Sequence, residues 1–197
     1  MMFETLESRM MLSTTVPAAS VSFSSGNLTI TGTSYTDTIK ITESSGSVTV
    51  VSESKTLGTF VGVKLTTIKG MGAADTITYA GNTEGAAIYA GNGNDTINVS
   101  DPPVATGSSM PYSVIYDGTG SSKIYVNSGV NTTVYAQTGA DSVYVKGGTN
   151  VRVFGHSTGS TRYDTISVSS YASHTTVYKD SLDKLSNSSS TTLIVAI

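Results

Sequence analysis

The chain has 197 residues, a formal net charge of −3, a pI near 5.2 and no cysteine. Its length is that of one domain, and 38% hydrophobic residues allow a thin core. Because the eleven Lys and Arg residues form no cluster, the composition argues against nucleic-acid binding. The lack of Cys excludes disulfides and thiolate metal sites, and no apolar run approaches the roughly 18 residues of a membrane span.

Residues 1–20 are interpreted as a leader or export segment, disordered or helical. The stretch Phe3–Ser13 resembles the short LEPR motif at the start of certain exported and surface-associated bacterial proteins, with Ser8 where that motif has Pro. The resemblance implies an extracellular or cell-surface location. As a secretory signal the segment is poor, because Glu4 and Glu7 occupy what should be a basic region. A leader without a targeting role is the alternative.

Residues 21–66 are expected to form an N-terminal cap of antiparallel strands within a single solenoid domain, residues 21–197. The segment Glu43–Ser47 lies between two alternating apolar runs and predicts a hairpin turn. A cap is needed because the exposed end of a solenoid is an aggregation-prone edge.

A repeat of fixed register predicts coils over residues 67–178. An aliphatic residue is followed by Asp seven positions later and by a second aliphatic residue two positions after that. The repeat occurs as Ile30/Asp37/Ile39, Ile68/Asp75/Ile77, Ile88/Asp95/Ile97 and Val134/Asp141/Val143. With few charges and many β-branched residues, this pattern predicts an all-β, right-handed parallel β-solenoid or β-roll of about seven coils with an antiparallel N-terminal cap.

Within one repeat, residues 88–97 predict two short strands joined by a six-residue turn. Side chains alternate along a strand, so Ile88, Ile97 and Val99 are expected inside and Tyr89 outside. Similar turns at 79–84, 127–131 and 146–150 are expected on the other edge.

The stretch Ala90–Asn98 resembles one copy of the glycine-rich nonapeptide of hemolysin-type (RTX) calcium-binding β-rolls, with Ala90 where the first Gly should be. Other turns keep less of the pattern, and the resemblance covers roughly residues 27–170. It implies calcium held between same-edge turns of successive coils by Asp carboxylates and backbone carbonyls.

The best surviving pair of turns is 70–75 against 91–95. The resemblance implies that Asp75 and Asp95 are the carboxylate ligands of calcium and that Gly91 and Gly93 supply carbonyl oxygens. One turn cannot provide the six or more oxygens that calcium prefers, so two turns must share the ion. The alternative is that each Asp only hydrogen-bonds the local backbone.

Five rings occupy one outward position just before the turn: Tyr89, Tyr116, Tyr135, Phe154 and Tyr178. They predict a stacking ladder that stiffens the outer face, and the alternative is an aromatic strip that binds carbohydrate or a protein partner. The proline-containing insertion 101–111 predicts a surface loop.

Catalysis is not expected. Polysaccharide-active β-helices need clustered carboxylates with Lys or Arg, whereas here the Asp residues lie in turns. His156, Ser157 and Asp164 form a triad only on paper, because they share one irregular insertion.

Residues 179–197 are expected to be a C-terminal cap that ends in an apolar strand paired with the last coil. The sequence therefore predicts a secreted or cell-surface structural or adhesive β-solenoid with weak or vestigial calcium binding. Further candidate partners are surface glycans or other surface proteins. A carbohydrate-binding module and a degenerate polysaccharide-active β-helix are the alternatives.

Overall fold

A computed structural model describes residues 17–81, 85–101, 112–155 and 162–197, and these residues form strands, turns and no helix. The first of two large sheets has nine strands in spatial order: β1 (Ser20–Ser24), β2 (Asn27–Thr31), β6 (Leu65–Lys69), β8 (Ala86–Tyr89), β10 (Val114–Tyr116), β12 (Thr133–Tyr135), β15 (Arg152–Phe154), β18 (Thr176–Lys179) and β20 (Leu193–Ala196).

The second large sheet also has nine strands, in the order β19 (Lys184–Asn187), β16 (Thr165–Val168), β13 (Ser142–Val145), β11 (Lys123–Ser128), β9 (Thr96–Ser100), β7 (Thr76–Ala80), β3 (Thr38–Ser44), β4 (Ser47–Ser52) and β5 (Lys55–Val61). Two short strands, β14 (Gly148–Thr149) and β17 (Ala172–Ser173), pair with each other.

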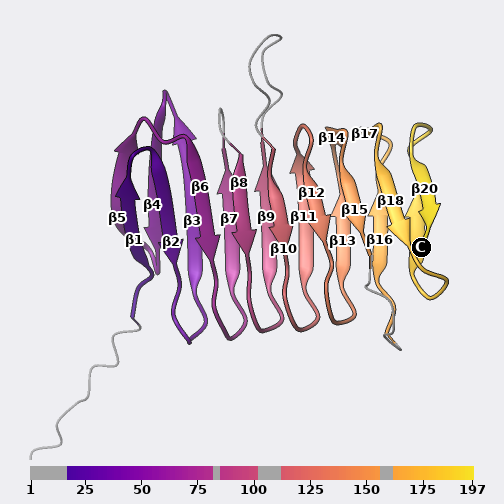
Figure 1. Cartoon of the computed structure of the whole chain (residues 1–197), viewed down its shortest axis with the longest axis horizontal. Coiled ribbons are helices and arrows are strands. Elements are labelled where there is room, and N and C mark those ends of the chain that lie inside the picture. Colours follow the sequence, from indigo (N-terminus) through magenta and orange to yellow (C-terminus); the bar gives the residue numbers. More distant parts are fainter. Residues whose placement is uncertain (1–16, 82–84, 102–111, 156–161) are drawn as a thin grey trace, which may run out of the picture.

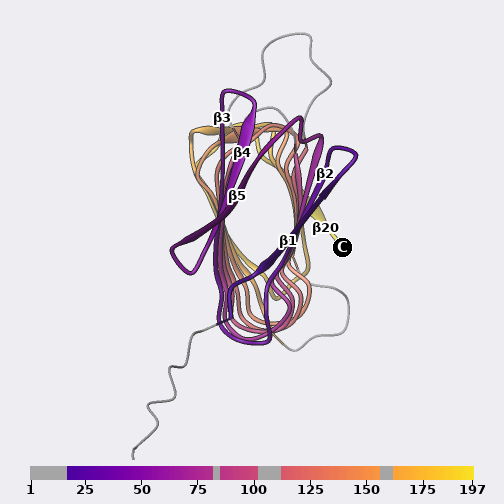
Figure 2. The same ribbon diagram turned by 90° about the vertical axis from the view of Figure 1, so that its left-hand side faces the viewer.

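From β6 onward the chain winds from one sheet to the other and back, and each strand of a coil pairs in parallel with its equivalent in the neighbouring coil (Figure 1). The view along the winding axis shows the two sheets facing each other across a narrow interior (Figure 2). The predicted all-β parallel solenoid with an antiparallel N-terminal cap is therefore confirmed.

The predicted count of about seven coils differs from the structure, because the uniform part of the solenoid is shorter. A six-residue turn leads from the first to the second sheet at residues 32–37, 70–75, 90–95, 117–122 and 136–141, and the last four of these turns belong to uninterrupted coils in succession. The earlier coil is interrupted by the antiparallel strands β4 and β5, and the later connections, 155–164 and 180–183, change length.

The N-terminal end is closed by antiparallel strands. β1 pairs with β2, and β3, β4 and β5 form a meander that continues the second sheet. Phe23 of β1 contacts Phe60 of β5 with ring centroids 5.4 Å apart. The predicted hairpin turn at Glu43–Ser47 is confirmed, since Ser45 and Gly46 have φ values of 52° and 73°, as a type I′ turn requires.

The core consists of aliphatic rows that run along the solenoid. Ile88 of the first sheet and Ile97 and Val99 of the second are fully buried, as predicted, and Tyr89 points outward. Burial of one such side chain contributes roughly 1.5–3 kcal/mol, so the coils are stabilised mainly by these rows.

Tyr79 is a correction to the sequence prediction, which placed it in a turn. The structure puts it at a core position of β7, with 2% of its surface exposed. Gly81 makes this possible, because a Cβ there would overlap the phenol ring of Tyr79.

The predicted final strand is present as β20, which pairs in parallel with β18. Its side chains Leu193 and Ile194 are exposed by 61% and 52%.

Candidate functional site

A row of buried polar side chains runs inside one edge of the solenoid, where each turn leads into a strand of the second sheet. The residue that ends each of these turns lies two positions before a buried aliphatic residue, so its side chain also points inward. We call this set the acidic row: Asp37, Asp75, Asp95, Ser122, Asp141, Asp164 and Asp183, all exposed by 5% or less.

Hydrogen bonds join the members of the acidic row from coil to coil. The backbone N–H of Asp37 donates to Asp75 Oδ1 at 2.8 Å, and the N–H of Asp75 donates to Asp95 Oδ1 at 2.7 Å. The chain of bonds continues through Ser122 to the last three Asp residues, with distances from 2.7 to 3.3 Å. Each side chain of the row after Asp37 therefore satisfies a buried N–H of the preceding coil.

The second carboxylate oxygens of this row are the atoms available to a proton or a cation. Among the described residues, Asp75 Oδ2 and Asp95 Oδ2 are buried and have no hydrogen-bond partner. The pKa of Asp75 is raised to about 7, mainly by burial and also by the nearby carboxylates of Asp95 and Asp37, while the hydrogen bond from the N–H of Asp37 opposes the rise. Burial also raises the pKa of Asp95. A buried carboxylate oxygen needs a proton or a cation, because desolvation disfavours the bare charge.

One additional acid joins the row from the start of a turn. Asp117 is 1% exposed, and its Oδ1 accepts the N–H of Gln137 at 2.7 Å. Burial, together with the neighbouring carboxyl group of Asp141, raises the pKa of Asp117 to about 8. At neutral pH a proton therefore remains on these two neighbouring carboxyl groups, and we call Asp117 and Asp141 the proton-sharing pair.

The predicted calcium ligands are only partly brought together. Asp75 and Asp95 are adjacent in the acidic row, and Gly91 and Gly93 have the positive φ values, 104° and 138°, that this tight turn needs. However, the Gly91 carbonyl accepts the N–H of Thr119 at 2.9 Å, and the Gly93 N–H donates to the Thr119 carbonyl at 2.7 Å. These backbone hydrogen bonds join the 91–95 turn to the following turn, 117–122.

Among the predicted calcium ligands, the carboxylates are better suited to the ion than the backbone carbonyls. Asp75 and Asp95 offer two buried oxygens, whereas the Gly91 carbonyl is already in use. Across the described ranges, no group of three or more His, Asp or Glu side chains is placed to hold a metal ion. Any ion at this site would depend on two carboxylates and on turn carbonyls.

The opposite edge carries a different buried acid. Asp101 Oδ2 accepts the hydroxyl of Ser113 at 2.8 Å, and Ser113 Oγ accepts the N–H of Ala86 at 3.2 Å. Burial raises the pKa of Asp101 to about 6, and its hydrogen bond with Ser113 opposes the shift. Asp101 is the first residue of the predicted loop 101–111, of which residues 102–111 lie outside the described residues.

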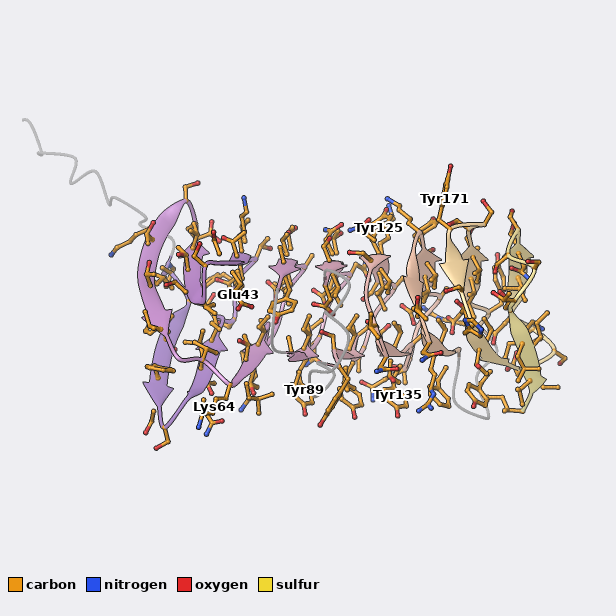
Figure 3. All side chains as sticks on the ribbon, turned by 90° about the horizontal axis from the view of Figure 1, so that it is seen from above. Glu43, Lys64, Tyr89, Tyr125, Tyr135 and Tyr171 are labelled. Atoms are coloured by element: carbon orange, nitrogen blue, oxygen red, sulfur yellow. The ribbon has the colours of Figure 1, made fainter. Side chains whose placement is uncertain are left out.

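The predicted ring ladder is confirmed on the outer face of the first sheet. Successive centroids from Tyr89 to Tyr178 are 5.1, 4.9, 4.8 and 4.3 Å apart, and neighbouring planes differ by 1° to 13°. A second stacked pair, Tyr125 and Tyr144, lies on the outer face of the second sheet. Figure 3 shows Tyr89 and Tyr135 on one side of the molecule and Tyr125 on the other.

Stacking changes what the ring ladder offers to a ligand. Tyr116, Tyr135 and Phe154 each have a ring on both sides, so their flat faces are covered and only their edges point to solvent. A sugar that stacks on aromatic faces cannot use them. Tyr89, the first ring, has a ring neighbour on one side only.

The structure describes only one of the three residues of the triad considered from the sequence, Asp164. His156 and Ser157 lie outside the described residues, as does the LEPR-like segment Phe3–Ser13. Asp164 belongs to the acidic row, where its Oδ1 accepts the N–H of Asp141 at 2.9 Å.

Comparison of the chain with protein-family models, with curated proteins and with solved structures gives no match. Within the part of the chain that the structure describes, no helix is long and apolar enough to cross a membrane.

Proposed function

We propose that this protein is a secreted or cell-surface structural or adhesive solenoid whose acidic row binds calcium weakly between the turns that end at Asp75 and Asp95. The observation that carries the calcium proposal is the pair of buried oxygens, Asp75 Oδ2 and Asp95 Oδ2, without a hydrogen-bond partner in the described residues. The structural role is supported by the hydrogen-bonded row and the ring ladder, which both connect successive coils.

The site chemistry favours a weak affinity. Calcium prefers six to eight oxygen ligands, and extracellular modules bind it with dissociation constants of roughly 10⁻⁴ to 10⁻³ M. Two carboxylates supply charge, but the Gly91 carbonyl already accepts the N–H of Thr119, so only its second lone pair remains for an ion. An affinity in this range is useful only where calcium is abundant, which is consistent with an extracellular location.

Calcium and protons compete for the same oxygens. Burial raises the pKa of Asp75 to about 7, so a proton occupies this carboxyl group below neutral pH. Metal ligands must be deprotonated, and calcium binding is therefore expected to strengthen as the pH rises above 7.

The test is thermal unfolding at pH 8 with excess calcium and, separately, with a chelator. We expect calcium to raise the Tm of the wild type, because a ligand that binds only the folded state stabilises it, by about 1.4 kcal/mol at ten times its dissociation constant. Asp95→Asn should abolish this rise. The matched control is Asp101→Asn, which removes a buried carboxylate from the opposite edge and should keep the calcium effect.

Equal melting curves with calcium and chelator at pH 8 would disprove the calcium part of the proposal. The location is tested separately by fractionation of cells that express the full chain. Recovery in the cytoplasmic fraction alone would contradict a surface or secreted role.

A further inference from the structure

The N-terminal end of the ring ladder is Tyr89, because the preceding coil has no ring at that register. Tyr89 pairs with Lys69 of β6, and Lys69 pairs with Thr31 of β2. Tyr89 is 44% exposed, and each of the other rings of the ladder is less exposed than Tyr89. The flat face of Tyr89 on the Lys69 side is the one face of the ladder's first ring that no other ring covers.

This end of the ladder borders a groove lined by Thr67, Lys69, Met71, Tyr89 and Gly91. The lining is largely apolar, and Met71 is itself 52% exposed. An apolar groove with a few polar groups is the usual form of a small-ligand site. Lys69 supplies the only charge among the lining residues.

The charge around the groove selects an anion. The protein carries a net charge of −3, yet none of the nine strands of the first sheet contains Asp or Glu, and Lys69 and Arg152 lie on its outer face. Within the strands of this sheet, an acidic ligand therefore meets cations and no carboxylate. Electrostatic attraction to this face therefore favours acidic ligands over basic ones.

We propose that this groove binds one acidic sugar unit, a hexuronate residue of an extracellular polysaccharide, with its pyranose ring stacked on Tyr89 and its carboxylate paired with Lys69. The sugar continues the stack at the position where the ladder stops, and the hydroxyl of Thr67 lies within the same groove for a polar contact. The inference rests on the proposed adhesive role and supplies its ligand, but it does not require calcium.

The proposed site lies at the Tyr89 end of the ring ladder, whereas the sequence predicted a binding strip along all five rings. A strip would use every exposed ring, whereas here Tyr135 is stacked on both faces. Substitution of Tyr135 should therefore weaken sugar binding to a strip but not to a site at Tyr89.

The experiment is a calorimetric titration of the full chain with oligogalacturonate and with the same oligosaccharide after methyl esterification of its carboxyl groups. Both are run in chelator, so that calcium cannot bridge acid groups. We expect binding of the acidic form and a loss of at least tenfold in affinity for the ester. Tyr89→Leu and Lys69→Gln should each weaken binding of the acidic form at least tenfold.

The control variants are Tyr135→Leu, an interior ring, and Lys123→Gln, a cation on the second sheet; both should bind within twofold of the wild type. Circular dichroism and melting of every variant confirm that it is folded at the temperature of the titration. No binding of oligogalacturonate, equal binding of the ester, or unchanged binding by Tyr89→Leu would each overturn the proposal. A failure here with a positive calcium test would remove the sugar site alone, and the converse would remove the calcium site alone.

Discussion

The two inner edges of the solenoid bury different kinds of side chain at the start of each strand. At one edge the acidic row occupies the buried position at the start of each strand of the second sheet. At the other edge the equivalent position in the first sheet is filled by what we call the opposite row: Leu28, Thr66, Ala86, Ser113, Thr132, Val151 and Thr175, of which each is exposed by 1% or less. Three of these seven side chains have no polar atom, so this row cannot form a continuous chain of side-chain hydrogen bonds.

The difference shows which contacts hold each edge together. In the acidic row every member accepts a backbone N–H from the preceding coil or donates its own to the next one. In the opposite row Leu28, Ala86 and Val151 contribute packing alone. We therefore expect one edge to depend on polar side chains and on pH, and the other to depend on apolar volume.

The largest effect is expected from removing an acceptor in the acidic row. Asp95→Ala leaves the buried N–H of Asp75 without its 2.7 Å bond, whereas Asp95→Asn keeps an oxygen at that position. A lost partner for a buried donor costs about 1–3 kcal/mol. Urea unfolding at pH 5, where the raised pKa values keep repulsion in the row small, should show the Ala variant less stable than the Asn variant by that amount.

Equal stabilities of these two variants would mean that the row is not a set of necessary acceptors. Asp101→Ala against Asp101→Asn is the matched comparison at the opposite edge. There the acceptor serves a hydroxyl, Ser113, which can rotate toward another partner, so a smaller difference is expected.

The next effect is a fall in stability with rising pH. An unfolded Asp has a pKa near 3.9, whereas the folded pKa is about 7 for Asp75 and about 8 for Asp117. Between about pH 4 and pH 8 the folded state therefore binds more protons than the unfolded state. The free energy of unfolding is then highest below pH 4 and declines as pH rises through the folded pKa values.

Urea unfolding from pH 4 to pH 9 in chelator measures this decline. Asp117→Asn should flatten its upper part, because the amide of Asn can donate to Asp141 without a titrating proton. A free energy of unfolding that increases across this range in the wild type would contradict the buried, proton-sharing pair.

The sequence allowed prediction of the coils and of which aliphatic residues are buried, because an alternating pattern in a fixed repeat determines the face of each side chain. The same alternation also determines the direction of the Asp side chains. Asp95 lies two residues before Ile97, so both must point inward, and this predicts that Asp95 is buried. The bond from one Asp to the next could not be predicted, since it depends on the register between coils.

Asp117 was missed for a related reason. Ser122 replaces Asp at the end of its turn, and the acid appears instead at the start, where other coils have Gly70 or Ala90. The pattern therefore looked broken, although the carboxyl group still reaches the acidic row. Tyr79 was misplaced because the Gly81 that follows it suggested a turn, whereas this glycine makes room for the ring.

The smallest effects give the sharpest comparison, because one hydroxyl can be deleted from each row. Ser122 Oγ accepts the N–H of Asp95 at 3.3 Å, so Ser122→Ala should cost about 1 kcal/mol. Thr132 Oγ1 is buried, and no partner for it exists among the described residues. Thr132→Val keeps the shape of the side chain and should be neutral or should stabilise the protein by up to about 1 kcal/mol.

Val151, the next member of the opposite row, already shows that valine fits at this register. Chemical unfolding of both variants at pH 5 measures the two changes under one condition. Opposite signs are expected, since one hydroxyl is a required acceptor and the other carries only a desolvation cost. A loss of stability in Thr132→Val as large as that in Ser122→Ala would show that the opposite row is also held by its polar groups, and the distinction between the two edges would fail.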